Sequence, residues 1–439
     1  MPWFYEESKE IDLNKKREVM EKVIQEASNR ITKDFKKVLL LPPDITRCHS
    51  GAGKLTEMIY KLLPKTCKVD VIPTLGQHVP HTEEENKWMF GSIPQECFLE
   101  HDWRNGCKKI GEVSADYVKE VSKGKADWPI PVEINRKVVE ENYDLIVNIG
   151  HVVPHEVLGF ANHNKNYFIG LGGKEMICAS HMMAACCGIE NNLGQLITPL
   201  RACYNKAEKE YLNNIPHVYV QIVMARNQEG KLVTTGLYVG DDIETYLMAA
   251  KKSKEQNITV FDKPVKKIVA VMQANEFKST WVANKAIYRT RMAIADGGEL
   301  LIIAPGLERF GEQPEVDKII RKYGYVGTPA VMEQYKKNAD MQDLRHATAH
   351  LIHGSSEGRF SITYAPGKLT KSEIEGVNFK YADLGETLAR YNPEKMLEGW
   401  NTMPDGGKVY FISSPSAGLW AYKEKLEARN SKENKLKKQ

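Results

Sequence analysis

The sequence lacks the cysteine pairs that brace small secreted domains or hold structural zinc. Its eight cysteines are scattered, none is spaced as CxxC, and Cys186 directly precedes Cys187, an arrangement that rarely suits a disulfide framework. No HExxH motif is present either, so the spacing of histidines gives no support to a zinc hydrolase. We therefore expect free thiols and a reducing compartment.

Long apolar runs are missing as well. No segment approaches the roughly 18 uninterrupted apolar residues of a membrane-spanning helix. The first residues, MPWFYEESKEIDLNKK, contain no apolar stretch between a basic start and a small-residue cleavage site. The sequence thus predicts a cytoplasmic protein without a membrane partner.

Charge of one sign is also scarce. The chain has 61 Lys and Arg against 57 Asp and Glu, a net charge of +4. Residues 423–439 alone carry seven of the basic and three of the acidic residues, so this tail accounts for the whole excess. A neutral body gives little reason to expect nucleic acid as a partner, and the tail is interpreted as solvated and partly helical.

The phosphate-binding loops of common nucleotide enzymes are incomplete. GAGK at 51–54 lacks the earlier glycine of a phosphate loop and is followed by Leu55 where Ser or Thr would hold magnesium. LGGKE at 171–175 lacks the third glycine of a dinucleotide fingerprint. Binding of a nicotinamide cofactor therefore has fold-level support alone, which is weak support for a function.

Apolar strands alternating with helix-like segments are abundant. At 439 residues the chain exceeds what one hydrophobic core usually supports, which predicts two domains. The alternation predicts an α/β fold with mainly parallel sheets covered by helices. In the first half we expect strands at 37–43, 68–75 and 144–149, and an antiparallel extension from 217–225 and 231–240.

A second series of strands follows the polar stretch after residue 250. The apolar segments 268–274, 300–306, 360–367 and 408–414 are separated by helix-like stretches, as in a Rossmann-like domain. The predicted organisation is an N-terminal α/β domain at 1–261, a C-terminal Rossmann-like domain at 262–422 and the charged tail at 423–439.

Polar residues follow three of the predicted strands. Ligands in open parallel sheets bind beyond the carboxyl ends of the strands, so we expect these residues to meet in one crevice. Histidine carries protons near neutral pH and is the commonest metal ligand, which leaves open whether the cluster serves acid/base chemistry or a metal. The residues are Asp44, Thr46 and Arg47 after the first strand, Gln77, His78 and His81 after the second, and His151 and His155 after the third.

Five stretches in this order are PPDITR (42–47), GQHVPHTEEE (76–85), PHEVLGFANHNK (154–165) with His181 beyond it, NKA (284–286) and DGG (296–298). In them the chain resembles the lactate racemase family that depends on a nickel-pincer nucleotide. The intervals from His155 to Lys165 and from Lys165 to His181 are the most specific part. The chain departs from the family at 161–164, where Ala-Asn-His-Asn replaces a Ser-Gly-Gly-like turn, and we expect this loop to bind the cofactor phosphate or the substrate differently.

The resemblance implies an isomerase that inverts the hydroxyl-bearing C2 of a small 2-hydroxy acid by hydride transfer to and from the cofactor. That cofactor is a nickel complex of pyridinium-3,5-bisthiocarboxylic acid mononucleotide, which separate cofactor-synthesis proteins make. By resemblance, Lys165 attaches it covalently, His181 ligates nickel, and Asp44 and Thr46 contact it. His78 and His155 are the implied acid/base pair, and Arg47 and Lys285 the implied carboxylate-binding residues.

Two other functions stay open at this point. A nicotinamide-dependent 2-hydroxy acid dehydrogenase would share the hydride chemistry and release the 2-oxo acid. A non-catalytic homologue would retain a nucleotide or a metal for sensing, although the intact His78, His155, Lys165 and His181 argue against it. The substrate's identity within the 2-hydroxy acids is not fixed by the sequence.

Overall fold

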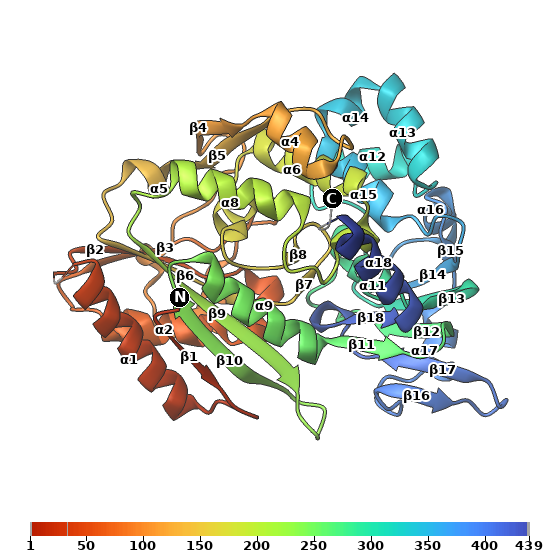
Figure 1. The fold of residues 1–439 in the computed structure, drawn as a ribbon. Helices are drawn as coiled ribbons and strands as arrows, with labels where there is room; N and C mark the ends of the chain where they lie inside the picture. The colour runs from red at the N-terminus through yellow and green to blue at the C-terminus, as the bar shows by residue number, and fades with distance from the viewer. Residues whose placement is uncertain (1, 33, 437–439) are drawn as a thin grey trace. The chain divides into compact units, whose positions relative to one another are not determined.

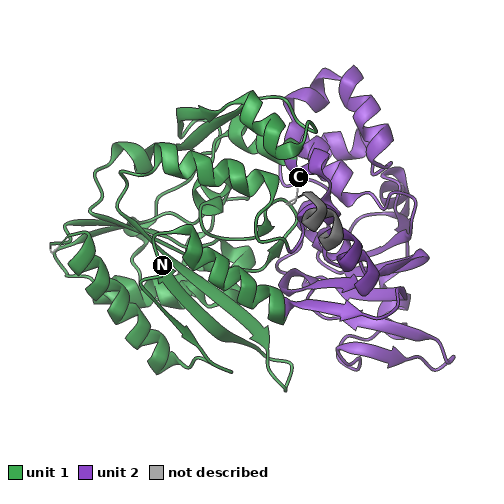
Figure 2. Ribbon diagram, viewed as in Figure 1, with its two compact units in different colours: residues 1–183, 195–256 green, residues 184–194, 257–439 purple. Residues whose placement is uncertain are grey.

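The computed structural model describes residues 2–32 and 34–436, with the side chains of 430–436 left aside. The chain forms two compact units, Met1–Met183 with Gln195–Gln256 and Ala184–Gly194 with Asn257–Gln439 (Figure 2). The predicted division after residue 261 differs from this one. Strand β11 (Ile258–Phe261) pairs in parallel with β18 (Leu419–Tyr422), and this pairing gives β11 to unit 2.

Unit 1 is built on a six-stranded sheet of order β1-β10-β9-β6-β2-β3 (Figure 1). Neighbouring strands from β3 to β9 are parallel, whereas β9–β10 and β10–β1 are antiparallel, so the predicted extension exists and β1 forms its edge. The strands are β1 (Phe4–Glu7), β2 (Lys37–Leu41), β3 (Lys68–Val71), β6 (Leu145–His151), β9 (His217–Arg226) and β10 (Leu232–Gly240).

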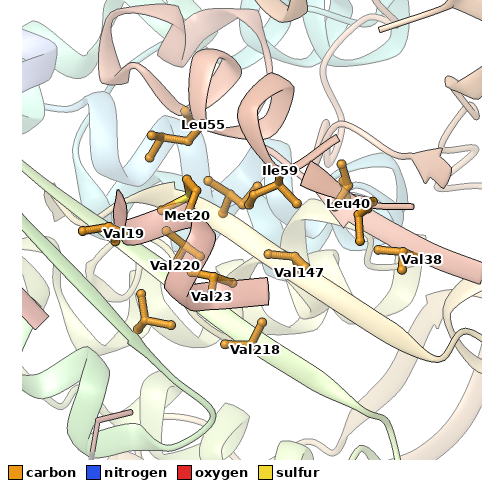
Figure 3. Packing of buried hydrophobic residues seen from close by; sticks show 14 of the residues in the cluster. Val19, Met20, Val23, Val38, Leu40, Leu55, Ile59, Val147, Val218 and Val220 are labelled. Carbon is orange, nitrogen blue, oxygen red and sulfur yellow. The ribbon is translucent and has the colours of Figure 1, made fainter. Parts of the chain in front are cut away.

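Helices cover both faces of this sheet because its strands are apolar on both. Alternate residues of β9 show the division, since Val220 belongs to a core cluster with α1 (Leu13–Arg30) and α2 (Ala52–Leu62), whereas Val223 packs with α9 (Ile243–Asn257). Figure 3 shows the first of these cores. Its labelled side chains are Val19, Met20, Val23, Leu55 and Ile59 from the helices and Val38, Leu40, Val147, Val218 and Val220 from the strands.

The remaining elements of unit 1 are mostly short, apart from the longer helices α6 and α8. Helix α3 begins with a capping box in which Thr82 and Glu85 satisfy each other's backbone N–H groups. The elements are η1 (Ile45–Ser50), α3 (Glu83–Phe90), η2 (Gln95–Cys97), β4 (Cys107–Val113), α4 (Ala115–Ser122), β5 (Ile130–Asn135), α5 (Arg136–Glu140), β7 (Pro154–His155), β8 (Gly159–Phe160), η3 (Asn166–Gly170), α6 (Lys174–Cys187) and α8 (Pro199–Tyr211).

Unit 2 contains a second six-stranded sheet, of order β15-β14-β13-β12-β17-β16. All neighbouring pairs are parallel except β16–β17, which makes the unit Rossmann-like as predicted. Its strands are β12 (Val265–Val271), β13 (Ile294–Ala304), β14 (Ser361–Pro366), β15 (Lys380–Tyr381), β16 (Gly399–Thr402) and β17 (Lys408–Ile412). Its helices are α7 (Ile189–Asn192), α10 (Thr280–Ala283), α11 (Lys285–Thr290), α12 (Pro314–Tyr323), α13 (Thr328–Lys337), α14 (Ala339–Asp343), α15 (Arg345–Gly354), α16 (Lys371–Gly376), α17 (Leu384–Arg390) and η4 (Pro415–Ala417).

The charged tail is largely one helix, α18 (Lys423–Leu436), and residues 437–439 lie outside the described residues. The tail is not solvated throughout. Arg429 is buried and donates hydrogen bonds to the carbonyl oxygens of Glu190 (3.2 Å) and Leu193 (2.6 Å), both within unit 2. Among the described helices, none is long and apolar enough to cross a membrane.

Candidate active site

The loops that follow β2 and β3 meet at the carboxyl ends of these strands in the unit 1 sheet. Strands β2 and β3 are adjacent and parallel, and a bridge between Pro43 and Thr74 continues their pairing beyond the strand ends. This pairing brings His78 against Asp44, and His78 Nδ1 is hydrogen-bonded to Asp44 Oδ2. Thr46 Oγ1 donates to the other carboxylate oxygen at 2.7 Å.

Asp44 orients the ring of His78 through this hydrogen bond. The carboxyl is buried, which would raise its pKa, but the His78 imidazole, the Thr46 hydroxyl and the Arg47 guanidinium together hold the pKa of Asp44 well below its ordinary value. An ionised Asp44 accepts the Nδ1–H of His78. The neutral imidazole then has a lone pair on Nε2, and the partly exposed ring can act as a general base there.

His81 has a structural role that spacing alone did not distinguish from a catalytic one. Its Nε2 accepts a hydrogen bond from the backbone N–H of Ile45 at 2.8 Å, and its Nδ1 lies 3.1 Å from Asn86 Oδ1. Both ring nitrogens therefore connect α3 to the start of η1. His81 holds in place the turn that carries Thr46 and Arg47.

His155 is buried on the short strand β7 and is protonated on the opposite nitrogen to His78. Its Nδ1 accepts from the backbone N–H of Val157 at 3.2 Å, so the proton of the neutral ring is on Nε2. That nitrogen lies 3.6 Å from Glu156 Oε1. The neutral His155 ring thus presents an N–H at Nε2, where the neutral His78 ring presents a lone pair. Sequence analysis had not assigned Glu156 a role, although it directly follows His155.

Lys165 follows a tightly held loop, residues 160–164, which we call the clamp loop. Asn162 and His163 adopt left-handed backbone conformations, with φ of 69° and 60°. The fully buried Arg201 of α8 donates to the carbonyl oxygens of Phe160 (2.7 Å) and Asn162 (3.3 Å) and to Asn164 Oδ1. One guanidinium therefore fixes the backbone that leads to Lys165.

The clamp loop turns its polar side chains into unit 1, and the expectation that its departure from the family pattern alters cofactor or substrate binding stays a prediction. All three polar side chains are buried and bonded within unit 1. Asn162 donates to Gly150 O (3.0 Å) and Gln221 Oε1 (2.7 Å), His163 stacks on Tyr219 with ring centroids 4.0 Å apart, and Asn164 donates to Asn205 Oδ1 and Glu208 Oε2 (both 2.8 Å).

Lys165 and Arg47 are two partly buried cations left without partners. Within residues 2–32 and 34–436, the ammonium of Lys165 and the guanidinium of Arg47 make no hydrogen bond or ion pair. Burial and the charge of Arg47 lower the pKa of Lys165 to about 7, so about half of its amine is neutral near that pH. Two cations that act on each other electrostatically and have no ion-pair partner within the described residues favour binding of an anionic ligand.

His181 has one ring nitrogen that a metal could use. On α6 its Nδ1–H donates to the carbonyl oxygen of Ile177 at 2.8 Å, which leaves the Nε2 lone pair for coordination. Burial is the main cause that lowers the pKa of His181 to about 4, with the positive charge of Lys165 contributing. The ring is therefore neutral at physiological pH, the form that binds metals.

The predicted site residues of unit 1 are thus linked by contact or by charge. Glu156 interacts electrostatically with Arg47, Lys165 and His181, and Asp44 does so with Arg47 and Lys165. Lys285 is different, because it is the first residue of α11 in unit 2, where its Nζ lies 5.6 Å from the centroid of the Phe277 ring. Its role stays a prediction.

A family model for the lactate racemase N-terminal domain matches residues 6–192. This region is similar to that domain. The match confirms the resemblance that the motifs indicated, and it contains every predicted site residue except Lys285. A comparison with curated proteins finds no match.

Two solved structures share the fold of the lactate racemase homologue. A structural-genomics protein from Thermotoga maritima is 24% identical, with a TM-score of 0.80, over 95% of this chain and 100% of its own. The lactate racemase apoprotein from Thermoanaerobacterium thermosaccharolyticum is 17% identical, with a TM-score of 0.64, over 91% of this chain and 92% of its own. Both confirm the α/β architecture across the two units.

Proposed function

We propose that this lactate racemase homologue is a cytoplasmic racemase or epimerase that inverts C2 of a small 2-hydroxy acid. The observation that carries the proposal is the presence of both Lys165 and His181 inside the matched region. Lys165 offers an amine free of hydrogen bonds in the described chain, and His181 offers a free ring nitrogen. A covalently attached metal–nucleotide cofactor requires both.

These residues fit the nickel-pincer nucleotide. A partly neutral Lys165 is nucleophilic enough to form a thioamide, and an imidazole beside sulfur donors suits nickel. Asp44 and Thr46 are the proposed supporting contacts. When bound, the cofactor supplies a hydride acceptor, which the reaction needs because the hydrogen on a hydroxyl-bearing carbon is barely acidic.

Substrate binding is assigned to the unpaired Arg47. Its planar, two-pronged donor set matches a carboxylate, and the other ionised groups near it are not bonded to it. Lys285, in unit 2, keeps its predicted role as a point-like charge for a carboxylate. Asp44 accepts a hydrogen bond from Thr46 of the same turn and forms no ion pair with Arg47. The guanidinium of Arg47 therefore stays available for the substrate carboxylate.

Proton transfer is assigned to the two oppositely protonated histidines. His78 takes the hydroxyl proton on Nε2, and the resulting imidazolium is stabilised by Asp44. His155 is assigned to the other face of the planar 2-oxo acid, where its Nε2, with Glu156 beside it, takes part in returning the proton to the oxygen.

Intact mass of the purified chain tests the proposal. Protein coexpressed with the cofactor-synthesis proteins is expected to carry one nucleotide-sized adduct that Lys165→Ala abolishes. Lys174→Ala, in the next segment of the chain, is the matched control and should retain it. Persistence of the adduct in Lys165→Ala contradicts the assigned tether. An unmodified chain that oxidises a 2-hydroxy acid with a nicotinamide cofactor favours the dehydrogenase alternative instead.

A further inference from the structure

The two unpaired cations have a consequence for the chain before its cofactor is attached. The nearby carboxylates act on them electrostatically, but their direct contacts are elsewhere: Asp44 is bonded to His78 and Thr46, and Glu156 lies against His155. Neither cation forms an ion pair within the described residues, although both are partly buried. Arg47 follows β2, and the clamp loop before Lys165 is bonded to the neighbouring strand β6 through Asn162 and Gly150 O, so both cations belong to the same end of the sheet. An amine and a guanidinium placed in this way match a carbonyl next to a carboxylate.

We propose that the cofactor-free chain binds 2-oxo acids covalently, as a reversible imine on Lys165 with the carboxylate held by Arg47. The assignment of the carboxylate to Arg47 rests on the proposed function. The imine extends that function by naming the 2-oxo acid, the oxidised form of the substrate, as a ligand of the unloaded protein.

The chemistry needs no oxidant or reductant. The Lys165 nitrogen adds to C2 of the oxo acid, and a proton moves to the former carbonyl oxygen to give a carbinolamine. The carbinolamine loses that oxygen as water, and the C–N double bond forms as the second amine proton leaves. The partial neutrality of the amine near pH 7 supports the first step, because only the unprotonated nitrogen attacks.

The imine occupies the same nitrogen that the thioamide requires. A 2-oxo acid would therefore compete with cofactor attachment, and its hydrolysis would restore the amine. The clamp loop contributes by holding the backbone on the N-terminal side of Lys165 through Arg201, so that the amine stays near Arg47.

Reductive trapping tests the imine on the full-length chain made without the cofactor pathway. The probe is pyruvate with sodium borohydride at pH 7.5, read by intact mass and peptide mapping. We expect one carboxyethyl group, on the peptide that contains Lys165. Lys165→Arg should lose it, whereas Lys174→Arg should retain it.

Selectivity tests the role of Arg47. Butanone, a ketone without a carboxylate, should label the same lysine at least about tenfold less at limiting concentration, and Arg47→Met should reduce pyruvate labelling by a similar factor. Circular dichroism establishes that each variant is folded. Labelling spread over exposed lysines, or equal labelling by pyruvate and butanone, overturns the proposal.

The outcome is separable from that of the proposed function. A trapped imine in a chain that never acquires a nucleotide adduct would leave the 2-oxo acid site standing and remove the racemase assignment. A nucleotide adduct on Lys165 without any pyruvate trapping in the unloaded chain would do the reverse.

Discussion

Replacing Arg201 by methionine is the sharpest test of how the chain holds Lys165. The substitution keeps a long apolar stem and removes the guanidinium that bonds to Phe160 O, Asn162 O and Asn164 Oδ1 and that lies 4.4 Å above the ring of Tyr246. Two buried carbonyl oxygens then lose donors. Breaking a buried charged network in this way costs about 3–5 kcal/mol.

Thermal and urea unfolding of the cofactor-free protein measure this cost. For a unit of this size a loss of about 3–5 kcal/mol lowers the midpoint by roughly 10 °C. Arg201→Lys keeps the charge but cannot reach three acceptors with one planar group, so its loss should be intermediate. Arg321→Met is the control, because that arginine is in an exposed pair with Asp317 and Glu373 and should cost less than about 1 kcal/mol. If Arg201→Met costs no more than Arg321→Met, the clamp interpretation is wrong.

Three further predictions concern other groups. His181→Ala should lose nickel from protein coexpressed with the cofactor-synthesis proteins, whereas His78→Ala should retain it; equal loss, measured by metal analysis, would refute this division. In single turnovers with isotopically labelled substrate, His78→Ala and His155→Ala should block opposite enantiomers, and the loss in steady-state racemisation should be about a hundred- to ten-thousand-fold; blocking of the same enantiomer would count against the two-face assignment. Burial lowers the pKa values of His101 and His217 to about 4. The unfolded chain therefore binds more protons between about pH 6.5 and 4, so the free energy of unfolding should fall as pH falls through that window, and urea titrations should show a shallower fall for His101→Gln.

The sequence was informative where chemistry follows strand ends. Apolar runs located β2, β3 and β6, and parallel pairing then required the residues after β2 and β3 to meet, as Asp44 and His78 do. The direction of the second-domain strands also followed from their alternation with helices. Such inferences work because burial and connection rules constrain parallel sheets strongly.

Tertiary partners were less accessible to sequence reasoning. Nothing local shows that Arg201, on a helix about forty residues later, holds the clamp loop, or that His81 caps η1 instead of serving catalysis. Glu156 was overlooked although it adjoins His155, because a single acidic residue has no periodicity. The pairing of β11 with β18, which assigns β11 to unit 2, joins segments far apart in the chain and leaves no local signal in the sequence.

The inward-facing side chains of the clamp loop make it inseparable from α8. Grafting a Ser-Gly-Gly turn onto 162–164 would remove partners of Arg201 and Glu208 and leave two opposite charges in the core with fewer hydrogen bonds. Exchange of the loop between relatives is therefore expected to succeed only when α8 is transplanted with it. The segment before Lys165 and the helix that starts at Pro199 therefore form one structural unit that has to be exchanged as a whole, although the chain between them passes through unit 2.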